Sequence, residues 1–309
     1  GDMGANTSRS LLVFDFIMNG DLEWEIDGNA VAFATGFQYR QDDVSNKNYG
    51  DARCADNKPC QPELHFLPMT YDSANENKNY AFFGELSLPV SENLDIDLGV
   101  RYEDYDVDDI TVPKVSAFYK VSDTLALRAS YEEVFRTPII PNAIDTSLER
   151  IGGEYYEVQT PIPTNLQPES SDNINLGLIW TPVEGMRVNL DYYSLDMVDP
   201  IGKVSTTSPL AIYNCADGTN YSPPAAKPDT CQLINVTTNA INGEGIETDG
   251  LDFQMLYDFE TSMGQAQVGF NGVYLLNYDI GGCLTAGCDK YDAAGKYNTR
   301  ATGSPIRVR

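Results

Sequence analysis

The sequence predicts an all-β protein that forms part of an antiparallel transmembrane β-barrel, with about eleven strands in this chain. Apolar and polar residues alternate with a period of two in a series of segments, which is the period that places neighbouring strand side chains on opposite faces. The segments are about ten residues long and carry Tyr, Trp or Phe near an end, as membrane-crossing strands do. Their connections alternate between short and long, which is typical of barrels with tight turns on one side of the membrane.

In the first third of the chain, residues 1–10 carry no strand signal, and an apolar run begins at residue 11. The turn Asp27-Gly28-Asn29 between two apolar runs predicts a hairpin, followed by a strand over 30–40. A long polar loop is expected over 41–78. Further strands are predicted over 80–88, 94–105 and 111–121, joined in part by tight turns at 89–93 and 122–123.

The middle of the chain contains the segments 124–135, 173–181 and 186–197, each with one apolar and one polar face. Long loops are expected over 136–171 and 198–243, with a tight turn at 182–185 between the last two strands. Strands over 245–259 and 265–278 follow, joined by a turn at 261–264, and a fourth long loop covers 279–298.

This alternation predicts which side chains face lipid and which face water. Charged residues such as Asp97 belong on a wet face, because a charge that faces lipid is costly. We expect lipid-facing side chains at Ile96, Leu98, Leu127, Leu176, Leu190 and Phe253, and lumen-facing ones at Asp97, Arg101, Arg128 and Asn175.

The six cysteines form three close sequence pairs, and every pair lies in a predicted long loop. Local bridges are favoured because each pair is alone in a polar, Pro-, Gly- or Asp-rich segment, and they imply an oxidising compartment. A zinc site is disfavoured, since His65 is the single histidine and no Cys-x-x-Cys spacing occurs. The expected pairs are Cys54 with Cys60, Cys215 with Cys231, and Cys283 with Cys288.

Composition excludes several functions. A net charge of -26 argues against nucleic-acid binding, which needs a basic surface. No apolar run reaches the roughly 18 residues of a transmembrane helix. No phosphate-binding glycine loop, nucleophile elbow or metal triad occurs, so we expect no enzyme activity and no cofactor.

Several short motifs resemble the barrel of TonB-dependent outer-membrane receptors. They are Phe135-Arg136-Thr137-Pro138, the run from Leu166 to Asn173, Leu190-Asp191-Tyr192-Tyr193, Asp199-Pro200-Ile201 and Gly250-Leu251-Asp252. Their order and spacing make the resemblance specific, and it covers most of residues 20–278.

The resemblance implies a barrel of about 22 strands, closed by an N-terminal plug, that imports a scarce ligand with energy passed on by TonB. The chain starts at Gly1 without a signal peptide, so we expect 1–309 to be a partial barrel domain that lacks the plug, the TonB-contacting box and the last strands. The implied partners are outer-membrane lipid, the TonB complex through the plug, and a small-molecule or glycan ligand.

The ligand itself is left open between an iron chelate, cobalamin and a glycan. An acidic rim repels anionic chelates unless Arg128, Arg136 and Arg150 form a basic patch, so a neutral ligand is equally consistent. Residues of the long loops that are candidates for ligand contact are Phe66, Tyr71, Arg136, Arg150, Tyr155 and Tyr156.

The main alternative is a secreted all-β ligand-binding module with disulfide-closed loops, which buries its apolar faces between two sheets. The position of Trp180, Tyr192 and Tyr257, in a dry core or on an outer surface, discriminates between the two.

Overall fold

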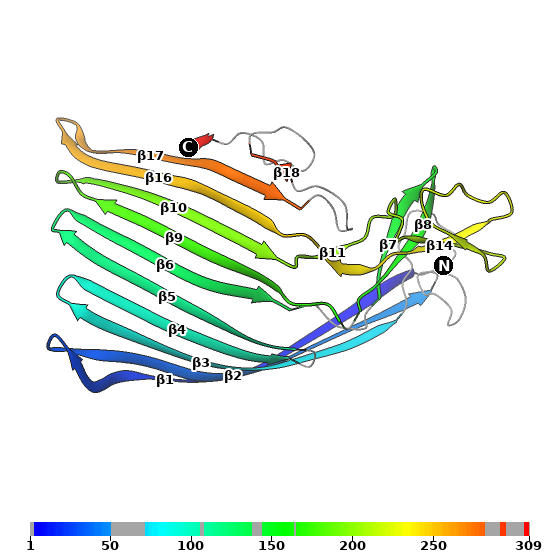
Figure 1. Cartoon of the computed structure of the whole chain (residues 1–309), viewed down its shortest axis with the longest axis horizontal. Helices are drawn as coiled ribbons and strands as arrows, with labels where there is room; N and C mark the ends of the chain where they lie inside the picture. Colours follow the sequence, from blue (N-terminus) through cyan, green and yellow to red (C-terminus); the bar gives the residue numbers. More distant parts are fainter. Residues whose placement is uncertain are drawn as a thin grey trace.

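The computed structural model describes residues 3–50, 72–105, 108–137, 144–163, 165–281, 291–294 and 306–308. Its largest unit, here called the main sheet, has 12 strands in the order β1-β2-β3-β4-β5-β6-β9-β10-β16-β17-β18, with β19 also paired to β17. The sheet is antiparallel throughout and is not closed into a barrel (Figure 1). The strands are β1 (Met3–Ile26), β2 (Asn29–Gly50), β3 (Ser73–Ser91), β4 (Leu94–Tyr105), β5 (Asp109–Ser122), β6 (Leu125–Arg136), β9 (Glu169–Trp180), β10 (Met186–Val198), β16 (Ile246–Thr261), β17 (Gly264–Ile280), β18 (Tyr291–Asp292) and β19 (Ile306–Val308).

Short turns gather at one end of the main sheet, as predicted. Two-residue turns lie at 27–28, 92–93, 123–124 and 262–263, and a five-residue turn lies at 181–185. Asp27 and Gly28 both have positive φ, 51° and 77°, which is the geometry of the type I′ turn that matches the twist of a hairpin. The long connections emerge at the opposite end, on the right in Figure 1.

The register of the strands places the side chains on two separate faces, as the alternation predicts. Leu127, Leu178, Leu190 and Phe253 are consecutive cross-strand partners on one face. Asp97, Ser116, Ser130 and Asn175 are consecutive partners on the other face. The first face is called the apolar face and the second the polar face.

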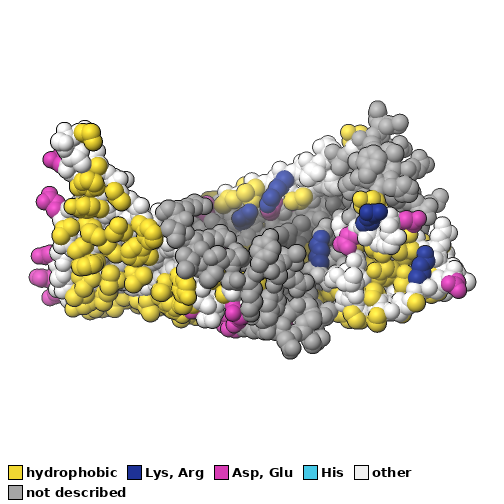
Figure 2. All heavy atoms as spheres, turned by 90° about the horizontal axis from the view of Figure 1, so that it is seen from above, with side chains coloured by type: hydrophobic (Ala, Val, Ile, Leu, Met, Phe, Trp, Pro, Cys, Tyr) yellow, Lys and Arg dark blue, Asp and Glu magenta, His cyan; other side chains and the backbone are white. Residues whose placement is uncertain are grey.

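The apolar face is a surface and is not packed as a core. Leu98, Leu127, Leu176 and Leu190 are 38–51% exposed, and Trp180 is 45% exposed. Figure 2 shows apolar side chains gathered at the end of the sheet that carries the short turns, with acidic side chains at its border. This arrangement disagrees with the secreted-module alternative, which requires these residues in a dry interior between sheets. Within the described part of the chain, no helix is both long enough and apolar enough to cross a membrane.

The first hairpins are longer than predicted, which corrects two expectations. β1 starts at Met3, although residues 1–10 carried no strand signal. β2 continues to Gly50 and β3 begins at Ser73, so both strands extend into the predicted loop 41–78. Polar cross-strand pairs hold these extensions together: Arg9 pairs with Asp42, and Gln41 donates to Glu76 at 2.7 Å. Alternation failed to reveal them because both of their faces are polar.

The expected loops 136–171 and 198–243 are also corrected, because they contain strands. A five-stranded sheet has the order β13-β12-β14-β8-β7, and β11 pairs with β15 in a two-stranded sheet. The strands are β7 (Ile144–Ile151), β8 (Glu154–Pro161), β11 (Ile201–Lys203), β12 (Ile212–Cys215), β13 (Asn220–Tyr221), β14 (Leu233–Thr237) and β15 (Ala240–Asn242). The five-stranded unit is called the loop sheet.

Candidate ligand-capture site

The loop sheet joins two long loops into one unit. β7 and β8 come from the first loop and β12, β13 and β14 from the second, and β14 pairs with β8 in parallel. Val236 lies opposite Val158 in this pairing, and the backbone N–H of Thr238 donates to the carbonyl of Gln159 at 2.8 Å. The two loops are therefore connected by main-chain hydrogen bonds as well as by side-chain contacts.

A small apolar core stabilises one side of the loop sheet. Val158, Ala211, Tyr213 and Val236 form a buried cluster against which Ile151, Tyr221 and Leu233 pack. Next to it the hydroxyls of Thr160 and Thr238, from the two loops, are 2.8 Å apart and buried.

The predicted disulfide between Cys215 and Cys231 is present, and both cysteines are buried. It closes a loop with a sequence separation of 16 within the second of the two connected loops. The other two predicted pairs, Cys54 with Cys60 and Cys283 with Cys288, lie outside the described residues and remain predictions.

Polar contacts attach the loop strands to the end of the main sheet. The carboxylate of Glu169, at the start of β9, accepts hydrogen bonds from Arg136 at 2.6 and 2.8 Å and from the backbone N–H of Ile201. Asn242 of β15 bonds to the backbone N–H and carbonyl of Gln167, both at 2.9 Å, and to the carbonyl of Asp199 at 2.8 Å. These contacts fix where the second loop leaves and rejoins the main sheet.

The second side of the loop sheet carries polar residues in cross-strand register. Asn214 lies opposite Asn235, which lies opposite Glu157, and Thr237 lies opposite Gln159. Arg150 lies opposite Tyr155, at the Gly152-Gly153 end of the same hairpin. We call this surface the amide face. The name refers to Arg150, Tyr155, Glu157, Gln159, Asn214, Asn235 and Thr237. Ile212, opposite Thr237, and Asn220, opposite Asn214, lie on the same side of the sheet.

Hydrogen bonds order the amide face. The amide nitrogen of Asn214 donates to Asn235 at 2.8 Å and to Thr237 at 3.1 Å, and Gln159 donates to Glu157 at 2.6 Å. Glu157 is 4% exposed, and burial raises the pKa of its carboxyl, an effect that the bond from Gln159 opposes. Tyr155 is 45% exposed.

The sequence candidates separate between the two sides of the loop sheet. Arg150 and Tyr155 lie together on the amide face, where the guanidinium of Arg150 donates to the carbonyl of Gly153 at 3.2 Å. Tyr156 points to the other side, and its hydroxyl donates to Glu154 at 2.6 Å, which raises its pKa to about 12. Phe66 and Tyr71 lie outside the described residues.

The polar face of the main sheet carries ion pairs and hydroxyl contacts. Arg128 on β6 forms a bidentate pair with Asp191 on β10, at 2.7 to 2.9 Å, and the pair crosses β9 above Gly177. Arg128 and Arg136 are thus each bound to a carboxylate. Of the three arginines considered for a basic patch, Arg150 alone has no such bond among the described residues, and it lies on the loop sheet.

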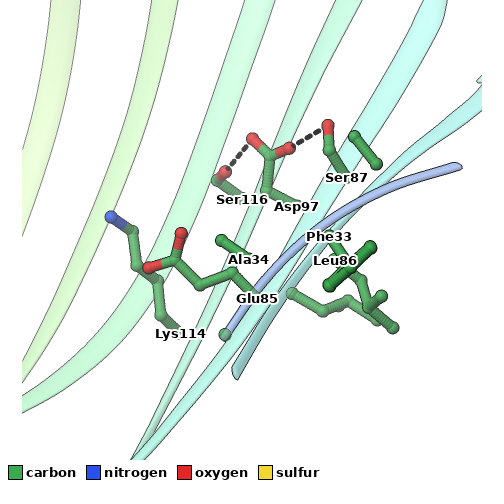
Figure 3. Close-up of a pocket in the computed structure, with 11 residues that line it drawn as sticks. Phe33, Ala34, Glu85, Leu86, Ser87, Asp97, Lys114 and Ser116 are labelled. Carbon is green, nitrogen blue, oxygen red and sulfur yellow. Dashed lines mark hydrogen bonds between the residues drawn. The ribbon is translucent and has the colours of Figure 1, made fainter. Parts of the chain in front are cut away.

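On the same face, Asp97 accepts hydrogen bonds from Ser87 at 2.7 Å and from Ser116 at 3.0 Å (Figure 3). Glu85 and Lys114 line the same open pocket of about 280 Å³. Within the described residues no group of three or more His, Cys, Asp or Glu side chains is placed to hold a metal ion.

Sequence reasoning missed the amide face as a unit. Its strands are short, and β8 and β14 are far apart in the chain, so no long alternating pattern connects them. The available signal was brief: Tyr155, Glu157 and Gln159 alternate along one segment, and Asn235 and Thr237 along another.

Comparison with solved structures shows the fold. A ferric enterobactin receptor mutant from Pseudomonas aeruginosa is similar with a TM-score of 0.64 and 16% identity, over 88% of this chain and 36% of that one. The siderophore receptor PirA from Acinetobacter baumannii has a TM-score of 0.63 and 15% identity, over 93% of this chain and 39% of that one. The chain therefore spans well under half the length of these receptors.

No curated protein matches the sequence. The family model described as "TonB dependent receptor-like, beta-barrel" matches residues 1–307, which is almost the whole chain. The apolar and polar faces, the short turns at one end and the long connections at the other agree with that match. This chain belongs to the family of TonB-dependent receptor-like β-barrels, whose members are bacterial outer-membrane proteins.

Proposed function

We propose that this chain is the barrel part of an outer-membrane receptor that imports a scarce ligand with energy passed on by TonB. The observation that carries the proposal is the loop sheet, a folded unit attached at Glu169 and Asn242 to the end of a sheet with one apolar and one polar face. A receptor needs such an ordered structure above its channel, because an ordered site loses less conformational entropy when it binds a ligand.

In this proposal residues 1–309 form a partial barrel domain, and the plug and its contact with TonB belong to the rest of the protein. Lipid surrounds the apolar face, and the polar face lines the channel. Family membership and the absence of a recognisable catalytic motif favour a transporter and not an enzyme.

Two ligand classes follow from different observations. The similar solved structures are a ferric enterobactin receptor and a siderophore receptor, which favours an iron chelate. The net charge of -26, with Arg128 and Arg136 already bound to carboxylates, favours a neutral ligand such as a glycan or cobalamin.

The test is uptake by cells that carry the complete receptor, with and without functional TonB. Radiolabelled ferric enterobactin, cobalamin and neutral oligosaccharides are the probes. We expect uptake of at least one of them, and we expect that uptake to be lost without TonB. Uptake of the ligand at an unchanged rate in the absence of TonB would contradict the proposal and indicate a passive pore.

A further inference from the structure

The amide face is the strongest unassigned site in the described part of the molecule. Four strands from two loops bring three carboxamides, a hydroxyl, a carboxylate and an aromatic ring onto one surface. These groups contribute little to the core of the loop sheet, because Val158, Val236 and Tyr213 point to the opposite side. A structural role alone does not require so many hydrogen-bonding groups in register.

The hydrogen bonds within the amide face leave donors and acceptors for a ligand. Asn214 uses its amide nitrogen to bond Asn235 and Thr237, so its carbonyl oxygen and the amide nitrogen of Asn235 stay available among the described residues. The amide face thus presents hydrogen-bond donors and acceptors a few ångströms apart. Such a surface is complementary to a ligand whose functional groups each can donate and accept a hydrogen bond. Hydroxyl groups have this property.

The charge of the amide face also selects against ionic ligands. Its one cation, Arg150, and its one anion, Glu157, cancel in net charge, whereas the whole chain has a net charge of -26. The amide face has no net positive charge that would attract an anionic ligand, and Arg150 at its exposed end would repel a cationic ligand.

Tyr155 adds an apolar element to this polar surface. Tyr155 is 45% exposed and lies opposite Arg150 at the end of the hairpin. An exposed tyrosine ring next to amide groups provides a flat apolar surface together with directional hydrogen bonds. A pyranose ring, with an apolar face and a rim of hydroxyls, is complementary to both.

We propose that the amide face binds a neutral saccharide, with the sugar ring stacked on Tyr155 and its hydroxyls bonded to Asn214, Asn235 and Gln159. The inference rests on the proposed import function and names the ligand class for it. Glu157 and Thr237 position Gln159 and Asn214 through the hydrogen bonds described above.

The experiment measures binding to the complete receptor in detergent by isothermal titration calorimetry. The probes are the hexasaccharides of maltose, cellulose, xylan and chitin, with ferric enterobactin as a non-saccharide probe. The test variants are Tyr155→Ala, which removes the ring, and Asn235→Ala, which removes the amide. Tyr155→Phe keeps the ring, and Tyr156→Phe alters the opposite side of the same strand.

We expect one of the oligosaccharides to bind, and Tyr155→Ala and Asn235→Ala each to weaken binding about tenfold or more, which corresponds to the loss of one good contact. Tyr155→Phe and Tyr156→Phe should retain affinity within about threefold. Asn235→Ala removes the acceptor of Asn214 and can loosen the loop sheet, so Tyr155→Ala, at an exposed position, is the decisive variant.

Two results would overturn the inference: binding of an oligosaccharide that Tyr155→Ala leaves unchanged, or no binding of any of the four. If none of the four oligosaccharides binds but ferric enterobactin is taken up in a TonB-dependent way, the proposed import function is supported and only the saccharide inference is wrong. Loss of TonB-dependent uptake for every probe would overturn the import function itself.

Discussion

At Gly177 the polar face of the main sheet carries an ion pair above a strand that contributes no side chain. A Cβ atom at this position would lie 2.1 Å from a carboxylate oxygen of Asp191 and 2.5 Å from Nε of Arg128. The pair spans β6 to β10 and can form only because β9 has a glycine between them. The glycine is thus needed for space rather than for an unusual backbone conformation.

We predict that Gly177→Ala displaces Arg128 from Asp191 and lowers the free energy of unfolding by about 1.5 to 3 kcal/mol, the range for hydrogen bonds to charged groups. The measurement is the midpoint of urea-induced unfolding of the complete receptor in detergent. Gly99→Ala is the matched control, because a Cβ there meets its nearest neighbours, Glu85 and Lys114, at an ordinary 3.6 Å. An equal decrease in the free energy of unfolding in Gly177→Ala and Gly99→Ala would contradict the steric explanation.

Glu157 makes the loop sheet sensitive to pH. Burial raises the pKa of this carboxyl in the folded state above its unfolded value, so the folded state holds the proton more tightly. The contribution of Glu157 to the stability of the loop sheet is therefore most favourable when the pH is below the pKa of this carboxyl in the unfolded chain. The contribution becomes less favourable as the pH rises from that pKa to the higher pKa of the same carboxyl in the folded state.

We predict that Glu157→Gln stabilises the loop sheet at pH 7.5 and has little effect at pH 4, because glutamine cannot ionise. The readout is hydrogen exchange of β8 amides in the variant relative to wild type at each pH, which cancels the intrinsic pH dependence of exchange. Slower exchange in the variant at pH 4 but not at pH 7.5 would show that the sign is wrong.

At the scale of single strands, the two faces of the main sheet make opposite demands on a side chain. Leu176 and Asn175 are neighbours on β9, and Leu176 belongs to the apolar face while Asn175 belongs to the polar face. Both lie several residues from the turn at 181–185, away from the ends of the strand.

We predict that Leu176→Arg destabilises the receptor by about 2 to 4 kcal/mol, the cost of a cation that faces lipid near the middle of the membrane. Asn175→Arg should cost much less, since water reaches the polar face. Unfolding in lipid vesicles, followed by tryptophan fluorescence, compares the two variants. Equal destabilisation would indicate that the facing is incorrect.

The disulfide Cys215–Cys231 stabilises the loop sheet by constraining the unfolded chain. For a closed loop of this size, the chain-entropy model gives about 3 kcal/mol. We predict that the double variant Cys215→Ser, Cys231→Ser makes residues 199–245 sensitive to proteases while the main sheet stays resistant. Cleavage sites are identified by mass spectrometry, and an unchanged digestion pattern would show that the bridge contributes little.

The sequence was informative where an element obeys a simple period and uninformative elsewhere. Alternation located the strands around Leu98, Leu127 and Leu190, because lipid on one side and water on the other impose it. It failed in the outer parts of β1, β2 and β3, where both faces carry polar residues, and in the loop sheet, where a parallel contact between β8 and β14 depends on three-dimensional packing. Single residues such as Arg150 and Tyr155 were identified as candidates, but their shared surface was not.

At the scale of the whole molecule, the main sheet is open and its two outermost strands differ. Among the residues that the structure describes, β1 pairs only with β2, whereas β17 pairs with β16 and also with the short strands β18 and β19. Strand edges that face hydrocarbon leave backbone N–H and C=O groups without partners, and each such group costs several kcal/mol. A closed barrel removes this cost by pairing the two edges through further strands.

We predict that these 309 residues, produced alone, do not form a soluble monomer. The apolar face is exposed along the main sheet, and the free edge of β1 is a template for pairing with another chain, so the protein should aggregate in water and require detergent. Analytical ultracentrifugation of refolded protein with and without detergent tests this, and the complete receptor in the same detergent is the control, because its barrel can close. A monomer without detergent that unfolds in one cooperative transition would mean that the apolar face is buried in some other way, and would favour the secreted binding module over the membrane receptor.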